Sequence, residues 1–409
     1  MDDLRQDLER YLSDPVARRE PDALFHRLVT QAPVLDLGRV WVVSGYNEIV
    51  AAAVHPAVVT DPKAVGLELP ESPVTAPLRR LLPMRSGTDH TRLRQVVSAP
   101  FSARATEQLR PAVAAAIDEL LAPHLDSGQL DVIADLARPL PVTLSCAMIG
   151  VPVGDRDRVH QWAPVLARAA LTPWPSAEAT AALATVLDDL RQYVEGLRQD
   201  RAAAPADDLV GRLVAAHRAG RLTDDELFEH VILLFINGLD TLTSGLAVAA
   251  WRLLTRPELG QLVRERPEFA DAAFEECLRL STPIRIGGRI TATEVEFGGV
   301  TVPARSVLTL LFAAGNRDPR QFPEPDRFLP DRPQRRHLGY GHGTHRCLGA
   351  PLSTAVGGMV LRRLAALPGL ATELTAETVP WSRSLAFGGL DALPLTFDPA
   401  GQPALAVSR

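Results

Sequence analysis

Apolar residues recur at three- and four-residue spacing through most of the first 280 positions, a pattern typical of amphipathic helices. Clear examples are "ATEQLRPAVAAAIDELLAPHL", "AALATVLDDLRQYVEGLRQD" and "LTDDELFEHVILLFINGLDTLTSGLAVAAWRLL". Before the last apolar run, Thr223 precedes Asp224, Asp225 and Glu226, which suits an N-cap with an acidic first turn. We therefore predict one long helix over about 224–254.

Short strands are predicted where β-branched residues alternate between turn residues. Such stretches are "RVWVVSG", "RITATEVEFGGVTVPARSVLTLLF" and "LPLTFDP". No internal repeat, low-complexity block or linker divides the chain. The pattern therefore predicts a single domain over residues 1–409, mainly α-helical with small β-sheets attached.

Composition places this fold in a soluble protein. The 409 residues are 46% hydrophobic and 22% charged, and "MDDLRQDLERYLSDP" at the N-terminus has no apolar segment typical of a signal peptide or anchor. Apolar runs such as "HVILLFIN" are shorter than the about 20 residues that span a bilayer. Three widely spaced cysteines indicate a reducing compartment. We expect a cytoplasmic monomer that binds no membrane.

Charge gives no sign of a nucleic-acid partner. The net charge is −6, and Lys63 is the only lysine, so nearly all of the basic charge is arginine. The arginines are dispersed along the chain, without the basic patch that nucleic-acid binding requires. Arginine does suit bidentate binding of carboxylates, because its guanidinium group is a planar fork.

Candidate chemistry centres on "GYGHGTHRCLGAPL", residues 339–352. A lone cysteine is most often buried filler. Here the closely spaced glycines let the backbone approach a flat ligand and turn N–H groups toward the sulfur, which tunes a metal-bound thiolate. The helix predicted after Cys347 adds a dipole that favours negative charge. The pattern therefore favours a thiolate at Cys347.

Two other roles for Cys347 are disfavoured by the sequence. With His342 and His345 it makes three possible zinc ligands, but their spacing matches no usual structural zinc pattern. A nucleophilic thiol paired with His345 is also disfavoured, because nothing else in the chain resembles a thiol-enzyme motif.

The segment closely resembles the haem-binding loop of the cytochrome P450 family, Phe-Gly-x-Gly-x-His-x-Cys-x-Gly. Only the leading Phe differs, since Tyr340 stands in its place and keeps the aromatic wall. The resemblance implies the P450 fold, with haem b between an oxygen-activating helix and the cysteine loop at 339–349. It makes Cys347 the proximal iron ligand and His345 a propionate partner. By the same resemblance, Tyr340, Gly341 and Gly349 also belong to the haem-binding loop.

Two further motifs match the family in the same order. In "FEECLRL", Glu276 and Arg279 are three residues apart on one helical face, a spacing also common in surface ion pairs. The resemblance implies a structural triad completed by an arginine in the later segment "FPEPDRF", which we assign to Arg327.

In "DHTRLRQVVSAPFS", His90 and Arg94 lie on one helical face. By resemblance these two side chains, with Arg289, bind the haem propionates.

The oxygen-activating helix of the family carries Ala/Gly-Gly-x-Asp/Glu-Thr, and this chain has Asn237, Gly238, Leu239, Asp240 and Thr241. A threonine inside a helix can donate to the carbonyl four residues back, here that of Asn237, and open the helix locally. An acid beside an alcohol also makes a proton relay. We expect Asp240 to bring protons and Thr241 to organise the oxygen site.

The resemblance implies a monooxygenase that takes one oxygen atom from O2 for hydroxylation or epoxidation of a small molecule, as in secondary-metabolite tailoring. Electrons are expected from a ferredoxin and its NAD(P)H-dependent reductase. Arg335, Arg336 and Arg346 flank the loop and suit docking of an acidic ferredoxin, or are solvated surface arginines.

Two alternatives stay open. One is P450-type oxidative aryl coupling or another oxidation without hydroxylation, and the other is a non-catalytic haem-binding partner. Substrate-pocket candidates by resemblance are Asn237, Arg285, Ile286, Ala386 and Phe387. Asn237 replaces a small residue, Arg285 lies four residues before Arg289, and Gly388 stands where many relatives have Arg. These departures suggest a substrate with polar or acidic groups.

Overall fold

The structure is a computed structural model that describes residues 2–19, 21–38, 40–67, 72–171, 175–204, 206–333 and 336–399. The chain divides into two compact units, each assembled from separate stretches of sequence. The larger unit comprises residues 1–59, 109–139 and 241–409, and the smaller unit comprises residues 60–108 and 140–240.

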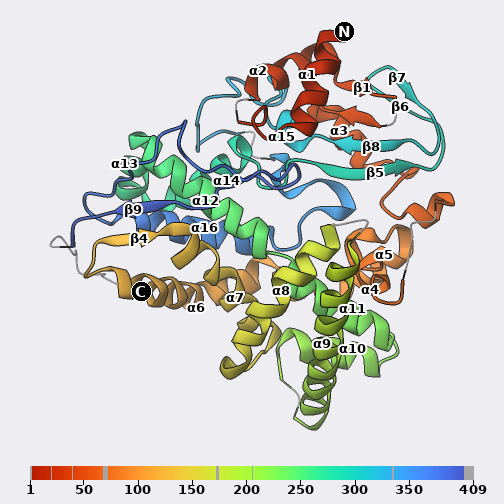
Figure 1. The fold of residues 1–409 in the computed structure, drawn as a ribbon, viewed down its shortest axis with the longest axis vertical. Helices are drawn as coiled ribbons and strands as arrows, with labels where there is room; N and C mark the ends of the chain where they lie inside the picture. The colour runs from red at the N-terminus through yellow and green to blue at the C-terminus, as the bar shows by residue number, and fades with distance from the viewer. Residues whose placement is uncertain are drawn as a thin grey trace. The chain divides into compact units, whose positions relative to one another are not determined.

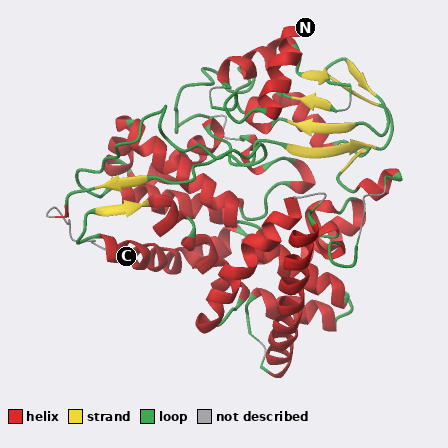
Figure 2. Cartoon of the chain, viewed as in Figure 1, coloured by secondary structure: helices red, strands yellow, loops and turns green. Residues whose placement is uncertain are grey.

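All strands of the described residues lie in the larger unit (Figures 1 and 2). The main sheet has the order β1 (Val34–Asp36), β2 (Trp41–Val43), β8 (Val307–Leu310), β5 (Gly287–Thr291) and β3 (Val58–Val59). β2 and β8 run parallel, and the other neighbouring strands are antiparallel. Two smaller sheets pair β6 (Val295–Phe297) with β7 (Val300–Val302) and β4 (Gln129–Asp131) with β9 (Pro394–Thr396).

The larger unit also contains helices. They are α1 (Asp2–Ser13), α2 (Asp22–Gln31), α3 (Tyr46–Val54), α13 (Pro257–Glu265), α14 (Ala270–Leu280), α15 (Phe312–Gly315), α16 (Ala350–Ala365) and most of α6 (Ala103–Leu121) and α12 (Leu239–Thr255). α14 and α16 pack so closely that a Cβ on Gly357 would lie 2.2 Å from the Phe274 ring. A glycine is therefore needed at this contact.

The smaller unit contains helices and no strand in its described residues. It contains α4 (Ala76–Arg79), α5 (Gly87–Val97), α8 (Arg156–Leu171), α9 (Ala177–Ala203), α10 (Leu209–Arg218), α11 (Asp224–Ile236) and nearly all of α7 (Pro139–Ile149). The predicted cap of α11 is confirmed: the Thr223 hydroxyl accepts from the Glu226 N–H at 3.2 Å, and the Glu226 carboxylate accepts from the Thr223 N–H at 2.9 Å. The predicted fold class, mainly helical with small sheets, is confirmed.

Two helical stretches are long and apolar enough to cross a membrane, Val132–Ile149 and Asp224–Thr255. They exceed the run "HVILLFIN" on which the sequence argument relied. In each, 56% of the tested window is buried inside the protein, as in the core helices of soluble proteins.

Candidate functional site

Cys347 closes a tight loop of the larger unit, just before α16. Gly341 and Gly343 have φ angles of 68° and 70°, which favour glycine. A Cβ on Gly343 would also lie 2.6 Å from the Ala53 carbonyl oxygen. The Cys347 N–H donates to the Tyr340 carbonyl at 2.7 Å. The Cys347 side chain is exposed, while the other two cysteines are buried, so Cys347 is the thiol that a ligand can reach.

Tyr340, the one departure from the family pattern, adds a polar network beside this loop. Its hydroxyl lies 3.1 Å from that of Thr354, which donates to Glu275, and Glu275 is 2.9 Å from the His337 ring nitrogen. Burial raises the pKa of Tyr340 well above its ordinary value, so the hydroxyl remains protonated. Sequence reasoning anticipated the aromatic ring here and missed this network.

The loop is tied to α14 through Asn316, which is fully buried. Asn316 Oδ1 accepts from the Leu338 N–H at 2.6 Å, and its Nδ2 donates to Thr282 at 2.8 Å. The Asn316 carbonyl accepts from Arg279 at 2.9 Å. Arg279, which binds Glu276, thus also bonds Asn316, and Asn316 in turn holds the Leu338 N–H just before the cysteine loop.

Glu276 and Arg279 pair as their spacing suggested. Arg279 Nε and Nη2 donate to the two carboxylate oxygens of Glu276 at 2.8 Å each. Arg332 Nε reaches the same carboxylate at 3.2 Å, and all three side chains are buried. The assignment of Arg327 as the third member is wrong, because its exposed guanidinium pairs with Glu324. Only the Arg327 carbonyl takes part, accepting from Arg279 and Arg332 at 3.1 Å each.

The reason lies in a repeated tripeptide. Pro-Asp-Arg occurs at residues 325–327 and again at 330–332. The first arginine follows Glu324, whose φ is +52°, and its side chain is 64% exposed. The second is directed inward, where its guanidinium also donates to the Glu324 carbonyl at 2.8 Å.

Arg289 lies on β5, opposite Leu308 of β8. Its guanidinium donates to the Gly288 carbonyl at 2.7 Å, and within the described residues no carboxylate forms an ion pair with it. Burial lowers the pKa of Arg289. A half-buried cation without a carboxylate suits an anionic ligand.

His90 and Arg94 belong to the smaller unit, where both lie on α5. His90 is 3% exposed and Arg94 is half-buried. Burial, and then the neighbouring charge of Arg94, lowers the pKa of His90. The pair therefore shares one side of its helix, with a neutral imidazole beside a guanidinium.

The predicted helix over about 224–254 is broken in two. α11 ends at Ile236 and α12 begins at Leu239, because Asn237 is extended and Gly238 has a φ of +100°. The expected hydrogen bond from the Thr241 hydroxyl to the Asn237 carbonyl is not present among the described contacts. The helix is therefore interrupted at Asn237 and Gly238, and not opened locally by a hydrogen bond of Thr241 as expected.

Asp240 is the last residue of the smaller unit and Thr241 the first of the larger. Asp240 is exposed and Thr241 half-buried. Beyond them, Thr243 donates to the Ala137 carbonyl at 2.8 Å. Gly389 packs so close to α12 that a Cβ there would lie 2.9 Å from the Ser244 hydroxyl. The hydrogen bond of Thr243 thus holds the helix that carries Thr241 within the larger unit.

Most of the substrate-pocket candidates come together in the larger unit. The Arg285 N–H donates to the Ala386 carbonyl at 2.8 Å, and Phe387 bridges to Ile284. Ile286 packs against the apolar cluster of α1 and α2. Asn237 lies in the smaller unit and is exposed.

These residues fit a haem. The loop offers one exposed thiol, and no group of three His, Cys, Asp or Glu side chains in the described ranges is arranged to hold a metal ion. A single protein ligand suffices where a porphyrin supplies the others. Arg289, a partly desolvated cation that pairs with no carboxylate of the described residues, suits a propionate.

Comparison with known proteins agrees with this arrangement. The cytochrome P450 family model matches residues 75–364. The 6-deoxyerythronolide B hydroxylase of Saccharopolyspora erythraea is 35% identical over 379 residues, which cover 90% of this chain and 92% of that protein. The mycinamicin IV hydroxylase/epoxidase of Micromonospora griseorubida is 35% identical over 76% of this chain and 78% of that protein.

Solved structures are similar over nearly the whole length. The crystal structure of CalO2 superposes with a TM-score of 0.88 at 29% identity, covering 95% of this chain and 98% of that one. CxnD, a cytochrome P450 enzyme for C–S bond formation in chuangxinmycin biosynthesis, has a TM-score of 0.81 at 27% identity, covering 93% of this chain and 95% of that one.

Proposed function

This chain belongs to the cytochrome P450 family, and we propose that it is a tailoring monooxygenase that places one oxygen atom of O2 in a small secondary-metabolite intermediate by hydroxylation or epoxidation. The observation that carries the proposal is the exposed Cys347 thiol in a loop closed by its own N–H. Haem b, when bound, supplies the iron at which O2 is activated.

Cys347 would hold the iron as a thiolate. The N-terminus of α16, three residues further on, favours negative charge at this position through its helix dipole. The haem propionates would be bound by Arg289, His90, Arg94 and His345. Tyr340, in the cysteine loop, would pack against the haem ring. The assignment of Arg289 is supported by its desolvated guanidinium, which pairs with no carboxylate of the described chain.

Proton delivery is assigned to Asp240 and Thr241. The exposed Asp240 carboxylate exchanges protons with solvent, and the half-buried Thr241 hydroxyl would pass them to the oxygen site. The hydrogen bond of Thr243 to the Ala137 carbonyl anchors α12 and so supports the position of that hydroxyl. Precise placement matters because a proton is transferred only within hydrogen-bond reach.

Electrons would come from a ferredoxin and its NAD(P)H-dependent reductase, in the cytoplasm, to a monomeric enzyme. Arg336 and Arg346 are exposed beside the cysteine loop and suit an acidic partner. Arg346 also lies over the Tyr340 ring, 5.9 Å from its centre, which places a positive charge close to the loop. Arg335, the third predicted docking residue, lies outside the described residues.

The decisive experiment is the difference spectrum of the reduced protein with carbon monoxide. Wild-type protein should show the thiolate-type Soret band, and Cys347→Ala should lose it. Cys146→Ala is the matched control, because burial raises the pKa of that thiol to about 11 and keeps it protonated. A normal thiolate band in Cys347→Ala would overturn the assignment.

Product mass then separates the two candidate reactions. A hydroxylase or epoxidase yields product with one added atom of labelled oxygen from O2. The C–S bond formation of the similar protein CxnD favours, as a second candidate, a coupling reaction that adds no oxygen.

A further inference from the structure

Arg18, in the turn after α1, is buried, and no carboxylate of the described residues pairs with it. It is 8% exposed, and its Nη1 donates to the carbonyls of Tyr11 and Leu12 at 2.9 and 3.0 Å. Nη2 donates to the Arg383 carbonyl at 3.0 Å. Its Nε is buried and has no partner in the described part of the chain. A full positive charge is thus bonded only to neutral oxygens.

Arg285 holds the next carbonyl of the same loop. Its Nη1 donates to the Ser384 carbonyl at 2.8 Å. A Cβ on Gly388 would lie 3.2 Å from Arg285 Nε, so the guanidinium uses the space that a side chain at 388 would fill. Burial lowers the pKa of Arg285, and the titratable groups that act on it are Tyr11 and Arg18. No carboxylate of the described residues forms an ion pair with it.

Tyr11 completes the group. It is 1% exposed, and its hydroxyl is buried with no hydrogen-bond partner among the described residues. Burial raises the pKa of Tyr11, so the hydroxyl is a protonated donor. Beside it lies the apolar cluster of α1 and α2, against which Ile286 and Leu385 pack.

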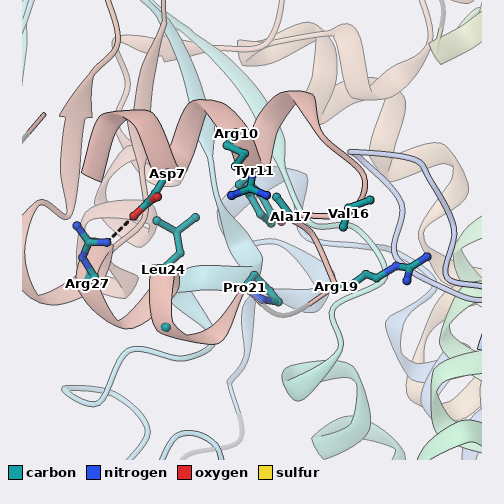
Figure 3. A pocket seen from close by; sticks show the side chains of 10 residues that line it. Asp7, Arg10, Tyr11, Val16, Ala17, Arg19, Pro21, Leu24 and Arg27 are labelled. Atoms are coloured by element: carbon teal, nitrogen blue, oxygen red, sulfur yellow. Dashed lines mark hydrogen bonds and ion pairs between the residues drawn. The ribbon is translucent and has the colours of Figure 1, made fainter. Parts of the chain in front are cut away.

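Surface arginines of the same helices are placed differently. They line a pocket of about 450 Å³ between α1 and α2, where Arg27 pairs with Asp7 at 2.5 Å (Figure 3). Arg10 pairs with Asp14 at 3.9 Å. Arg27 and Arg10 therefore have acidic partners, whereas no carboxylate of the described residues pairs with the buried Arg18 or the half-buried Arg285. Two cations that are largely removed from water and near each other are unfavourable unless an anion compensates them.

We propose that Arg18, Arg285 and Tyr11 bind the carboxylate of the substrate, which makes the substrate an amphiphilic carboxylic acid. Unused guanidinium N–H groups and the Tyr11 hydroxyl supply donors for two carboxylate oxygens. The neighbouring apolar side chains suit an alkyl segment. This inference rests on the proposed monooxygenase function and narrows its substrate class.

The test compares myristic acid with methyl myristate, which has the same chain and no charge. Binding to the haem-loaded protein is measured by calorimetry and by the ferric spin-state change. The variants are Arg18→Gln, Arg285→Gln, Arg285→Lys and Tyr11→Phe. Arg19→Gln is the matched control, since Arg19 adjoins Arg18 in sequence, is exposed and lines the surface pocket.

Wild-type protein should bind the acid at least tenfold more tightly than the ester. Arg18→Gln and Arg285→Gln should remove that preference through weaker binding of the acid, and Arg285→Lys should keep part of it. Tyr11→Phe should reduce it, and Arg19→Gln should leave it intact. The proposal is overturned if wild-type protein binds acid and ester equally or does not bind the acid. It is also overturned if the preference survives both glutamine variants or is lost in Arg19→Gln. The carbon monoxide spectrum of the same samples reports separately on the proposed function.

Discussion

Replacing Arg332 by alanine should destabilise the protein far more than replacing Arg327. Arg332 is buried and donates to the Glu276 carboxylate at 3.2 Å and to the carbonyls of Glu324 and Arg327 at 2.8 and 3.1 Å. Breaking a buried ion pair by removing one partner costs about 3 to 5 kcal/mol. Arg279 still holds Glu276 through two bonds, which places the expected loss near the lower end of that range.

Arg327→Ala is the matched control. Its side chain is 64% exposed and pairs only with Glu324, so its loss should change the free energy of unfolding by less than about 1 kcal/mol. Its backbone carbonyl, which accepts from Arg279 and Arg332, is retained in the variant.

The assay is urea unfolding followed by tryptophan fluorescence and far-ultraviolet circular dichroism, with haem retention as a third readout. Arg332→Ala should lower the unfolding midpoint and speed haem loss, because Arg279 also bonds the carbonyl of Asn316, which holds the cysteine loop. Equal midpoints for the two variants, or a larger loss in Arg327→Ala, would refute the reasoning.

Helix glycines provide a second contrast, measured by urea unfolding. Gly357→Ala should destabilise the protein by about 1 to 3 kcal/mol, because its Cβ would meet the Phe274 ring at 2.2 Å. Gly196→Ala on α9 places its Cβ in open space and should stabilise the protein by about 0.5 to 1 kcal/mol. Burial raises the pKa of Glu229 from 4.5 to about 7, so the folded state should lose up to about 3 kcal/mol as pH rises through that window. Glu229→Gln should remove this dependence in thermal midpoints recorded from pH 4 to 8; an unchanged slope would contradict it. Thr241→Ala should lower product formed per NAD(P)H and raise peroxide release, with Thr241→Ser close to wild type; normal coupling in the alanine variant would exclude the relay.

Local patterns predicted much of the fold because they depend on neighbours in sequence. The cap at Thr223 and the glycine-rich turns around Cys347 need only residues within a few positions. The break at Asn237 and Gly238 was also local, but apolar spacing continues across it. The periodicity predicts a continuous helix, whereas the Asn-Gly pair is a known turn signal. The backbone of Gly238, at a φ of +100°, shows that the turn signal prevails there.

Long-range contacts could not be predicted from the sequence where several residues of one type could bind the same partner. Two Pro-Asp-Arg tripeptides precede the cysteine loop, and either arginine matches the pattern. Which of them reaches Glu276 depends on the direction of the turn between them. That turn leaves Arg327 exposed and buries Arg332, which lies 56 positions from its partner.

In this protein the residues expected to perform the chemistry are close together in sequence, whereas those proposed to select the substrate are far apart. The oxidising centre is recognisable because Cys347 and its loop span about ten consecutive positions. Arg18, by contrast, belongs to no recognisable motif, and its burial depends on a hydrogen bond to the carbonyl of Arg383, 365 positions away. Since a buried cation is tolerated only beside compensating groups, we propose that residues held by such distant contacts select the substrate. Relatives that share the cysteine loop can thus differ in substrate without any change in the motif that reveals the family.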